Sequence, residues 1–117
     1  GDDCRVGGAS EIKNSIVFNN SNIPHHNYVG DSVIGSGCNL GSGTKIANLR
    51  LDKKEISVFS NGKKINTGRR KLGVIMGDNV QTGINSMIDT GSIIGNNVFV
   101  GPGAIVKDYI KPGSKIM

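Results

Sequence analysis

The sequence predicts an all-β domain folded as a parallel β-helix of six-residue repeats. In the C-terminal half a mostly aliphatic position recurs every six residues, at Met76, Thr82, Ile88, Ile94 and Val100, and glycine follows four of these five residues. Aromatic residues make up only 4% of the chain, Trp is absent, and 18 residues are Gly. A core of small branched side chains fits this composition better than the cores of ordinary sandwiches and bundles.

A six-residue period is too short for a strand followed by a helix, but it suits a short strand and a turn. Three such units make one triangular coil of roughly 18 residues, and stacked coils bury their aliphatic columns against one another. Glycine at the turns permits positive φ and a close approach of neighbouring coils. The period alone does not determine the handedness of the helix.

The same period continues on both sides of this segment. Downstream it runs to Val106-Lys107 and Pro112-Gly113, and upstream it gives Ile34-Gly35, Leu40-Gly41 and Ile46-Ala47. Near the start, four further residues fall six apart: Val6, Ile12, Phe18 and Pro24. Pro24 lies ten residues before Ile34, so this early series is out of phase with the later one. We expect a loop at about residues 25–31 to absorb this offset.

The period lapses at residues 49–72, which we expect to form a loop inserted into the helix. Ile56 and Val58 alternate with other residues ahead of a Ser-Asn-Gly turn, a pattern typical of a β-hairpin. The loop carries most of the positive charge of the chain. Two interpretations follow: a surface excursion without function, or a part of the functional site.

The net charge of +5 raises the question of nucleic-acid binding. The positive residues gather between Arg50 and Lys71, in a chain with few aromatic side chains to stack bases, so phosphorylated small molecules fit better.

Cys4 and Cys38 lie outside any C-x-x-C spacing and indicate neither a metal site nor a disulfide. No apolar run approaches the roughly 20 residues that cross a bilayer. We expect a cytoplasmic protein with reduced cysteines.

Both histidines lie in the segment PHHNYVGD, residues 24–31. Imidazole is the usual general base near neutral pH, so each is a candidate catalytic residue. Judged by position alone, a histidine in a loop is more often an exposed bystander. Two adjacent histidines also cannot both face one pocket.

The pattern H-x-x-Y-x-G-D is followed by I-G, by N-x-G-x-G-T from Asn39, and by Asn48. This combination resembles the bifunctional sugar-1-phosphate nucleotidylyltransferase/acetyltransferases, which join a glucosamine-1-phosphate acetyltransferase to an N-acetylglucosamine-1-phosphate uridylyltransferase. The resemblance runs from about Glu11 to Val106, and the R-R-K-L-G stretch is similar to the archaeal branch. It implies that residues 1–117 are one left-handed hexapeptide-repeat domain, a fragment of a longer chain. The family typically forms homotrimers and carries an N-terminal nucleotidylyltransferase domain.

The resemblance also implies roles for particular residues. His25 matches the base that takes a proton from the sugar amine, which leaves His26 as the bystander. The residues that match contacts to the sugar phosphate are Lys13, Tyr28, Asn39, Asn48 and Lys54. The loop that carries Lys54 is implied to reach a neighbouring chain's site. The positions that match the acetyl-CoA groove, where bacterial relatives have small residues, are Ser42, Ile84 and Pro102.

The implied activity is acetyl transfer from acetyl-CoA to the amine of a hexosamine 1-phosphate, either glucosamine or galactosamine 1-phosphate, without a metal ion. No acyl-enzyme is expected, because neither cysteine has a matched base nearby in the sequence. Two alternatives stay open: a non-catalytic trimerisation or regulatory module, and an acyltransferase for another amino sugar. The run Arg69, Arg70 and Lys71 suits phosphate oxygens, or it is simply a solvated face.

Overall fold

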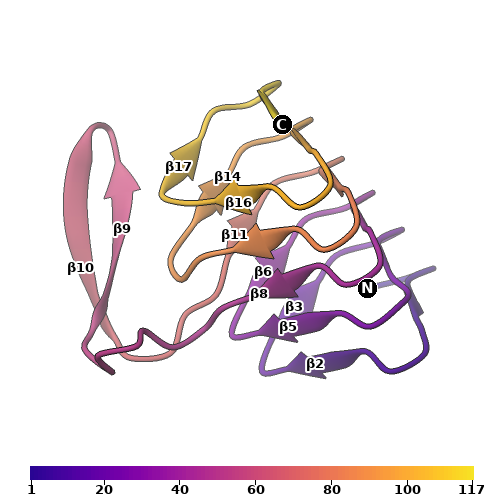
Figure 1. The fold of residues 1–117 in the computed structure, drawn as a ribbon, viewed down its shortest axis with the longest axis horizontal. Helices are drawn as coiled ribbons and strands as arrows, with labels where there is room; N and C mark the ends of the chain where they lie inside the picture. Colours follow the sequence, from indigo (N-terminus) through magenta and orange to yellow (C-terminus); the bar gives the residue numbers. More distant parts are fainter.

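The computed structural model describes residues 1–117, whose strands form three parallel sheets and one separate hairpin. The three sheets are the faces of a triangular prism (Figure 1). The first sheet contains β1 (Arg5–Val6), β4 (Asn22–Ile23), β7 (Asn39–Leu40), β12 (Gln81–Thr82), β15 (Phe99–Val100) and β18 (Lys115–Ile116). The second contains β2 (Glu11–Lys13), β5 (Tyr28–Gly30), β8 (Lys45–Ile46), β13 (Met87–Ile88) and β16 (Ile105–Val106). The third contains β3 (Ile16–Val17), β6 (Val33–Ile34), β11 (Ile75–Met76), β14 (Ile93–Ile94) and β17 (Tyr109–Ile110).

The chain passes through the three sheets in turn, so each circuit makes one coil of the prism. We call the turn from the first sheet to the second the first corner, the turn from the second to the third the second corner, and the turn back to the first the third corner. Every strand of the coils pairs in parallel with the equivalent strand of a neighbouring coil; β5, for example, pairs with β2 and β8. With no helix present, nothing helical in the structure is long and apolar enough to cross a membrane.

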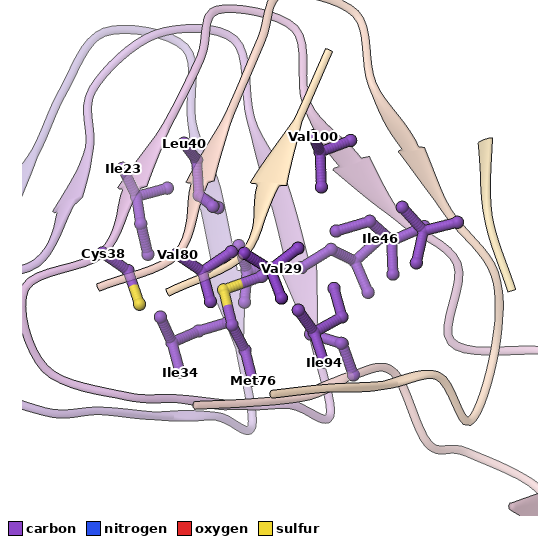
Figure 2. Close-up of a cluster of buried hydrophobic side chains, with 14 of the residues drawn as sticks. Ile23, Val29, Ile34, Cys38, Leu40, Ile46, Met76, Val80, Ile94 and Val100 are labelled. Carbon is purple, nitrogen blue, oxygen red and sulfur yellow. The ribbon is translucent and has the colours of Figure 1, made fainter. Parts of the chain in front are cut away.

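The core consists of aliphatic side chains that point into the prism from successive coils. A two-residue strand sends one side chain inward and one outward, because side chains alternate along extended backbone. The inward residue of most strands is branched and fully buried, as Ile34, Leu40 and Ile46 are. Figure 2 shows these side chains gathered inside the coils. The predicted aliphatic columns are confirmed, and their burial supplies the main stabilisation of the fold.

Small polar side chains are buried just inside the corners, where they satisfy backbone groups. Ser21 donates a hydrogen bond to the carbonyl of Gly35, and Asn27 donates to the carbonyls of Gly41 and Thr44. No buried side-chain nitrogen or oxygen lacks a partner. Since an unpaired buried polar group is costly, this pairing also fixes the spacing between neighbouring coils.

The predicted loop at residues 25–31 is wrong. The inward residue after Ile12 is Val17, and the one after Val29 is Ile34, so two steps of the second corner have five residues instead of six. These two short steps displace the register without interrupting the coils. Phe18, expected to point inward, is 49% exposed.

The step at the C-terminal end is also shorter than predicted. Ile110 follows Val106 after four residues, again at the second corner, and Ile116 occupies the next inward position. The predicted continuation of the period to Pro112 is therefore wrong, because Pro112 lies in an exposed turn. Every step at the first and third corners has six residues, so all variation in length falls at the second corner.

The predicted hairpin is confirmed. Between β8 and β11 the chain leaves the second corner and forms the antiparallel strands β9 (Ile56–Ser60) and β10 (Lys63–Arg69). The hairpin stands beside the prism in Figure 1. Ile56 is only 1% exposed, and a side chain at Gly91 would lie 2.7 Å from its Cγ2, so β9 is anchored against the coils.

We expect Ile34→Ala to lower the free energy of unfolding by about 2–4 kcal/mol, because the substitution leaves a cavity among fully buried neighbours. Ile65 provides a matched control, since it lies on the hairpin and is 48% exposed. Ile65→Ala should cost less than about 1 kcal/mol. Denaturant unfolding at one protein concentration measures both. Equal losses would contradict the assignment of the core.

Candidate active site

Four polar side chains meet at the second corner, beside the outer face of the second sheet. Asn48 Nδ2 donates to Tyr28 Oη at 3.1 Å and to Asp31 Oδ2 at 2.7 Å. Lys13 Nζ lies 3.3 Å from the same Asp31 oxygen. We call Lys13, Tyr28, Asp31 and Asn48 the corner cluster. It combines a cation, a phenol and a carboxamide around one buried carboxylate.

Asp31 is the most enclosed member of the corner cluster. Its side chain is 3% exposed, whereas that of Lys13 is 45% exposed. Asn14 Nδ2 donates to the second carboxylate oxygen at 2.7 Å. Burial on its own raises the pKa of Asp31, but the hydrogen bonds from Asn14, Asn48 and Lys13 outweigh it and hold the pKa below its ordinary value. The carboxylate is therefore charged at neutral pH.

Gly30 allows the phenol of Tyr28 to reach Asn48. A Cβ atom at position 30 would lie 2.6 Å from Tyr28 Oη and 2.6 Å from Asn48 Nδ2. Both distances are shorter than any side chain tolerates, so a larger residue here would push the two groups apart. The glycine of the H-x-x-Y-x-G-D pattern thus leaves the space in which Tyr28 and Asn48 make their hydrogen bond.

His25 lies at the first corner, at the turn that precedes β5. Its backbone N–H donates to Asn27 Oδ1 at 3.0 Å, and its carbonyl accepts from Gly43 at 3.1 Å. The imidazole is exposed and makes no hydrogen bond within the chain. His26 adopts a positive φ of 51° at the same turn. The corner therefore fixes the backbone of His25 and leaves its ring free to contact a bound molecule.

The three residues predicted to bind acetyl-CoA continue the same first corner in later coils. Backbone hydrogen bonds link the turns: Gly43 N–H to His25 O, Asn85 N–H to Ser42 O, and Gly103 N–H to Ile84 O. Ile84 and Pro102 are exposed, and Ser42 is half-buried. The structure thus brings the predicted base and the predicted cofactor residues into one column parallel to the axis of the helix.

The remaining two predicted residues belong neither to the corner cluster at the second corner nor to the column of His25 at the first corner. Asn39 points outward from β7 on the first sheet, next to Asn22. Lys54 is exposed in the loop and lines a separate hollow with Arg50, Asp52, Lys53, Glu55, Asn66 and Arg70. One chain by itself therefore does not bring all predicted contacts to a single point.

A groove of about 490 Å³ runs along the outer face of the second sheet, beside the corner cluster. Tyr28 and Asn48 are among its lining residues. Its other lining residues are mostly apolar, with lysines and one aspartate among them: Lys45, Ile46, Ala47, Leu49, Met87, Ile88, Asp89, Ile105 and Lys107. The groove therefore combines a mostly apolar lining with two lysines, Lys45 and Lys107, and one aspartate, Asp89.

Sequence reasoning assigned no role to Asp31, Gly30 or Asn27. Asp31 and Gly30 belong to the H-x-x-Y-x-G-D pattern, so the pattern itself was the available signal. Asn27 lies inside that pattern at a variable position, and only the structure shows that its buried amide links two coils. Asn14 lies one coil before Asp31, and its side chain donates a hydrogen bond to the Asp31 carboxylate. This contact requires a coil of 17 residues, whereas three repeats of six residues predict a coil of 18.

Comparison with known proteins places this architecture in a class. Residues 73–108 match the family model described as "bacterial transferase hexapeptide (six repeats)". PerB from Caulobacter crescentus, solved in complex with CoA and GDP-perosamine, superimposes with a TM-score of 0.62 at 17% identity, over 93% of this chain and 48% of that chain. The fold is accordingly the left-handed β-helix of hexapeptide-repeat transferases, as predicted.

The family can be stated more closely. The family described as "GMPPB C-terminal domain" matches residues 1–85, and the chain belongs to that family. A bifunctional sugar-1-phosphate nucleotidylyltransferase/acetyltransferase from Sulfurisphaera tokodaii is 50% identical over 102 residues, which are 87% of this chain and 25% of the relative. The bifunctional protein GlmU of Methanococcus maripaludis is 47% identical over 93% of this chain and 26% of its own length. The predicted resemblance is confirmed, and the chain spans about a quarter of these relatives.

The charge on Asp31 should make stability depend on pH. Because its folded pKa lies below the unfolded value, the carboxylate contributes stability above about pH 4, and this contribution disappears as pH falls through the folded pKa. We expect Asp31→Asn to be less stable than wild type by about 2 kcal/mol at pH 7. The difference should shrink below about pH 4, and denaturant unfolding at pH 7, 5 and 3 measures it.

Asp108 supplies the control for that comparison. It occupies the same corner with a similar φ of 61°, but it is exposed and forms no side-chain hydrogen bond. Asp108→Asn should change the stability by less than about 0.5 kcal/mol at each pH. A loss in Asp31→Asn that stays constant from pH 7 to pH 3 would show that the charge of Asp31 is not stabilising.

Proposed function

We propose that this domain transfers an acetyl group from acetyl-CoA to the amine of a hexosamine 1-phosphate, glucosamine or galactosamine 1-phosphate. The corner cluster carries the proposal, because it supplies the groups that a sugar phosphate needs. The ammonium of Lys13 and the phenol of Tyr28 suit a phosphate dianion, and Asn48 suits a sugar hydroxyl or amine. The bifunctional relatives, which are 50% and 47% identical to this chain over the matched residues, support the same substrate class.

His25 is the proposed general base. The amine attacks the thioester carbonyl carbon with its lone pair and forms a tetrahedral intermediate. His25 accepts the proton that the amine nitrogen loses, the C–S bond breaks, and the CoA thiolate takes up a proton as it leaves. The exposed imidazole, free of hydrogen bonds within the chain, supports this role. No covalent acyl-enzyme is required.

Acetyl-CoA is proposed to lie along the first corner, past Ser42, Ile84 and Pro102. The linked turns form a continuous edge that includes His25, so a cofactor lying on it would present its thioester to the base. The fold is shared with PerB, whose solved complex contains CoA. Backbone N–H groups of these turns are the candidates for stabilising the oxyanion of the intermediate.

The complete site is proposed to form between subunits of a homotrimer. Asn39 and Lys54 lie apart from the corner cluster in one chain, so a neighbouring chain would supply what is missing. The outward residues of the third sheet support such an assembly, because they form an unbroken apolar column of Ile16, Val33, Ile75, Ile93 and Tyr109. In the longer relatives a nucleotidylyltransferase domain accompanies the acetyltransferase, and we propose the same arrangement for the full protein.

The first test measures release of CoA thiol from acetyl-CoA, with glucosamine 1-phosphate or galactosamine 1-phosphate as acceptor. His25→Ala should lower the acceptor-dependent rate by about 100- to 10,000-fold, as expected when a general base is lost. His26→Ala, the adjacent control, should stay within a few-fold of wild type. Loss of activity in His26→Ala alone would reverse the assignment of the base.

Absence of release in a verified folded trimer would favour the non-catalytic assembly module. Release with other amino sugars, but with neither sugar phosphate, would keep the acetyl transfer and change the acceptor. Screening acceptors with radiolabelled acetyl-CoA separates these two outcomes, since a non-catalytic module labels none of them.

A shared site predicts complementation between two inactive chains. His25→Ala and Lys54→Ala are each expected to be inactive or nearly so, but mixed trimers would contain interfaces with both residues intact. Unfolding and refolding the two variants together should therefore restore a fraction of wild-type activity, measured by thiol release. Refolding each variant alone is the control. Mixed trimers shown to exist but without recovered activity would contradict the shared site.

A further inference from the structure

We propose that Asp31 is a positioning residue that fixes the carboxamide of Asn48, so that Asn48 Oδ1 is held as a hydrogen-bond acceptor for the substrate. This inference deepens the proposed function and rests on it for the identity of the substrate. The geometry that carries it belongs to the chain alone.

Three polar residues stack at the second corner in successive coils. Asn14, Asp31 and Asn48 are each 17 residues apart, which is the spacing of paired residues in this part of the helix. Asn14 donates to one oxygen of the Asp31 carboxylate and Asn48 donates to the other, at 2.7 Å each. The carboxylate is therefore held from both sides by amide groups.

The backbone around Asp31 leaves the carboxylate little freedom. Its N–H donates to Lys13 O at 2.9 Å, and its carbonyl accepts from Gly73 at 2.9 Å, so coils on both sides hold the residue. Its φ of 50° is left-handed, a conformation that Asp adopts more readily than most residues. Leu72 N–H donates to Asn48 O, so the end of the inserted loop is tied to the same corner.

Asp31 determines which way the amide of Asn48 faces. Asn48 Nδ2 has two protons, and both have acceptors, one on Asp31 and one on Tyr28. The reverse orientation would place Oδ1 against the carboxylate, with two acceptors in contact and no proton between them. Asn48 Oδ1 is therefore left without a partner in the chain, on a residue that lines the groove.

A fixed carbonyl acceptor has a definite use in the proposed reaction. An N–H of the attacking amine can donate to Asn48 Oδ1, which orients the nitrogen lone pair towards the thioester. Misplacing such a group by about 1 Å can cost about 100-fold in rate. Asp31 also holds Lys13, so its loss should in addition weaken binding of the sugar phosphate.

The test uses Asp31→Gly, because glycine accepts the left-handed φ without strain and removes the whole side chain with its carboxylate. We expect kcat at saturating acceptor to fall about 100-fold. Weaker phosphate binding through Lys13 should appear mainly as a higher KM. Asp108→Gly makes the same change at the same corner, where φ is 61° and the side chain is exposed, and should keep kcat within about threefold.

A double-mutant cycle separates positioning from general damage. If Asp31 acts through Asn48, the combination of Asp31→Gly and Asn48→Ala should have a kcat within about threefold of Asn48→Ala alone. Losses that multiply, or an Asp31→Gly variant with the kcat of wild type, would overturn the proposal.

A measurement without substrate tests the contact even if the proposed function fails. The side-chain amide of Asn48 gives a pair of nitrogen-15 correlated NMR signals, assigned by their loss in Asn48→Ala. In Asp31→Gly these signals should shift and exchange faster with water, whereas Asp108→Gly should leave them unchanged. Unchanged Asn48 signals in folded Asp31→Gly would overturn the proposal. Shifted signals in a chain that releases no CoA would instead refute the proposed function.

Discussion

The vertical stacking of inward aliphatic residues is the constraint on which the rest of this structure depends. Each coil must place its branched side chains on those of the coil before it, since parallel two-residue strands give little cohesion by themselves. This requirement holds every step at the first and third corners to six residues. The second corner absorbs all the differences, from the four-residue step after Val106 to the excursion between Ile46 and Met76.

The chemistry of the site follows from these differences in length. Two five-residue steps give the early coils a spacing of 17 residues, as the pairs Arg5 with Asn22 and Glu11 with Tyr28 show, whereas later pairs such as Ile75 with Ile93 are 18 apart. The shorter spacing places Asp31 between Asn14 and Asn48. A buried carboxylate surrounded by donors is the result, and it orders the polar groups at the edge of the groove.

Much of this could be predicted from the sequence, and the limits have physical reasons. The six-residue period predicted the aliphatic columns, and the alternation of Ile56 and Val58 before a Ser-Asn-Gly turn predicted the hairpin, because both patterns are local in the sequence. The same period misplaced Phe18 and Pro112, because a shortened corner changes the register without changing the local pattern. The resemblance named His25 and Tyr28 but gave Asp31 no role, since that role depends on contacts between coils. Asn39 and Lys54 lie away from the corner cluster, so the structure of one chain shows no contact between them and that cluster.

The freedom of the second corner has a consequence for how such domains can diversify. A residue inserted at the first or third corner would shift every later aliphatic side chain away from its stack, and selection would remove it. An insertion at the second corner leaves the stack intact, as the hairpin between β8 and β11 demonstrates. Since that corner also borders the groove, new recognition loops can arise there by simple gain or loss of residues. Foldability and ligand preference can thus evolve almost independently in this architecture.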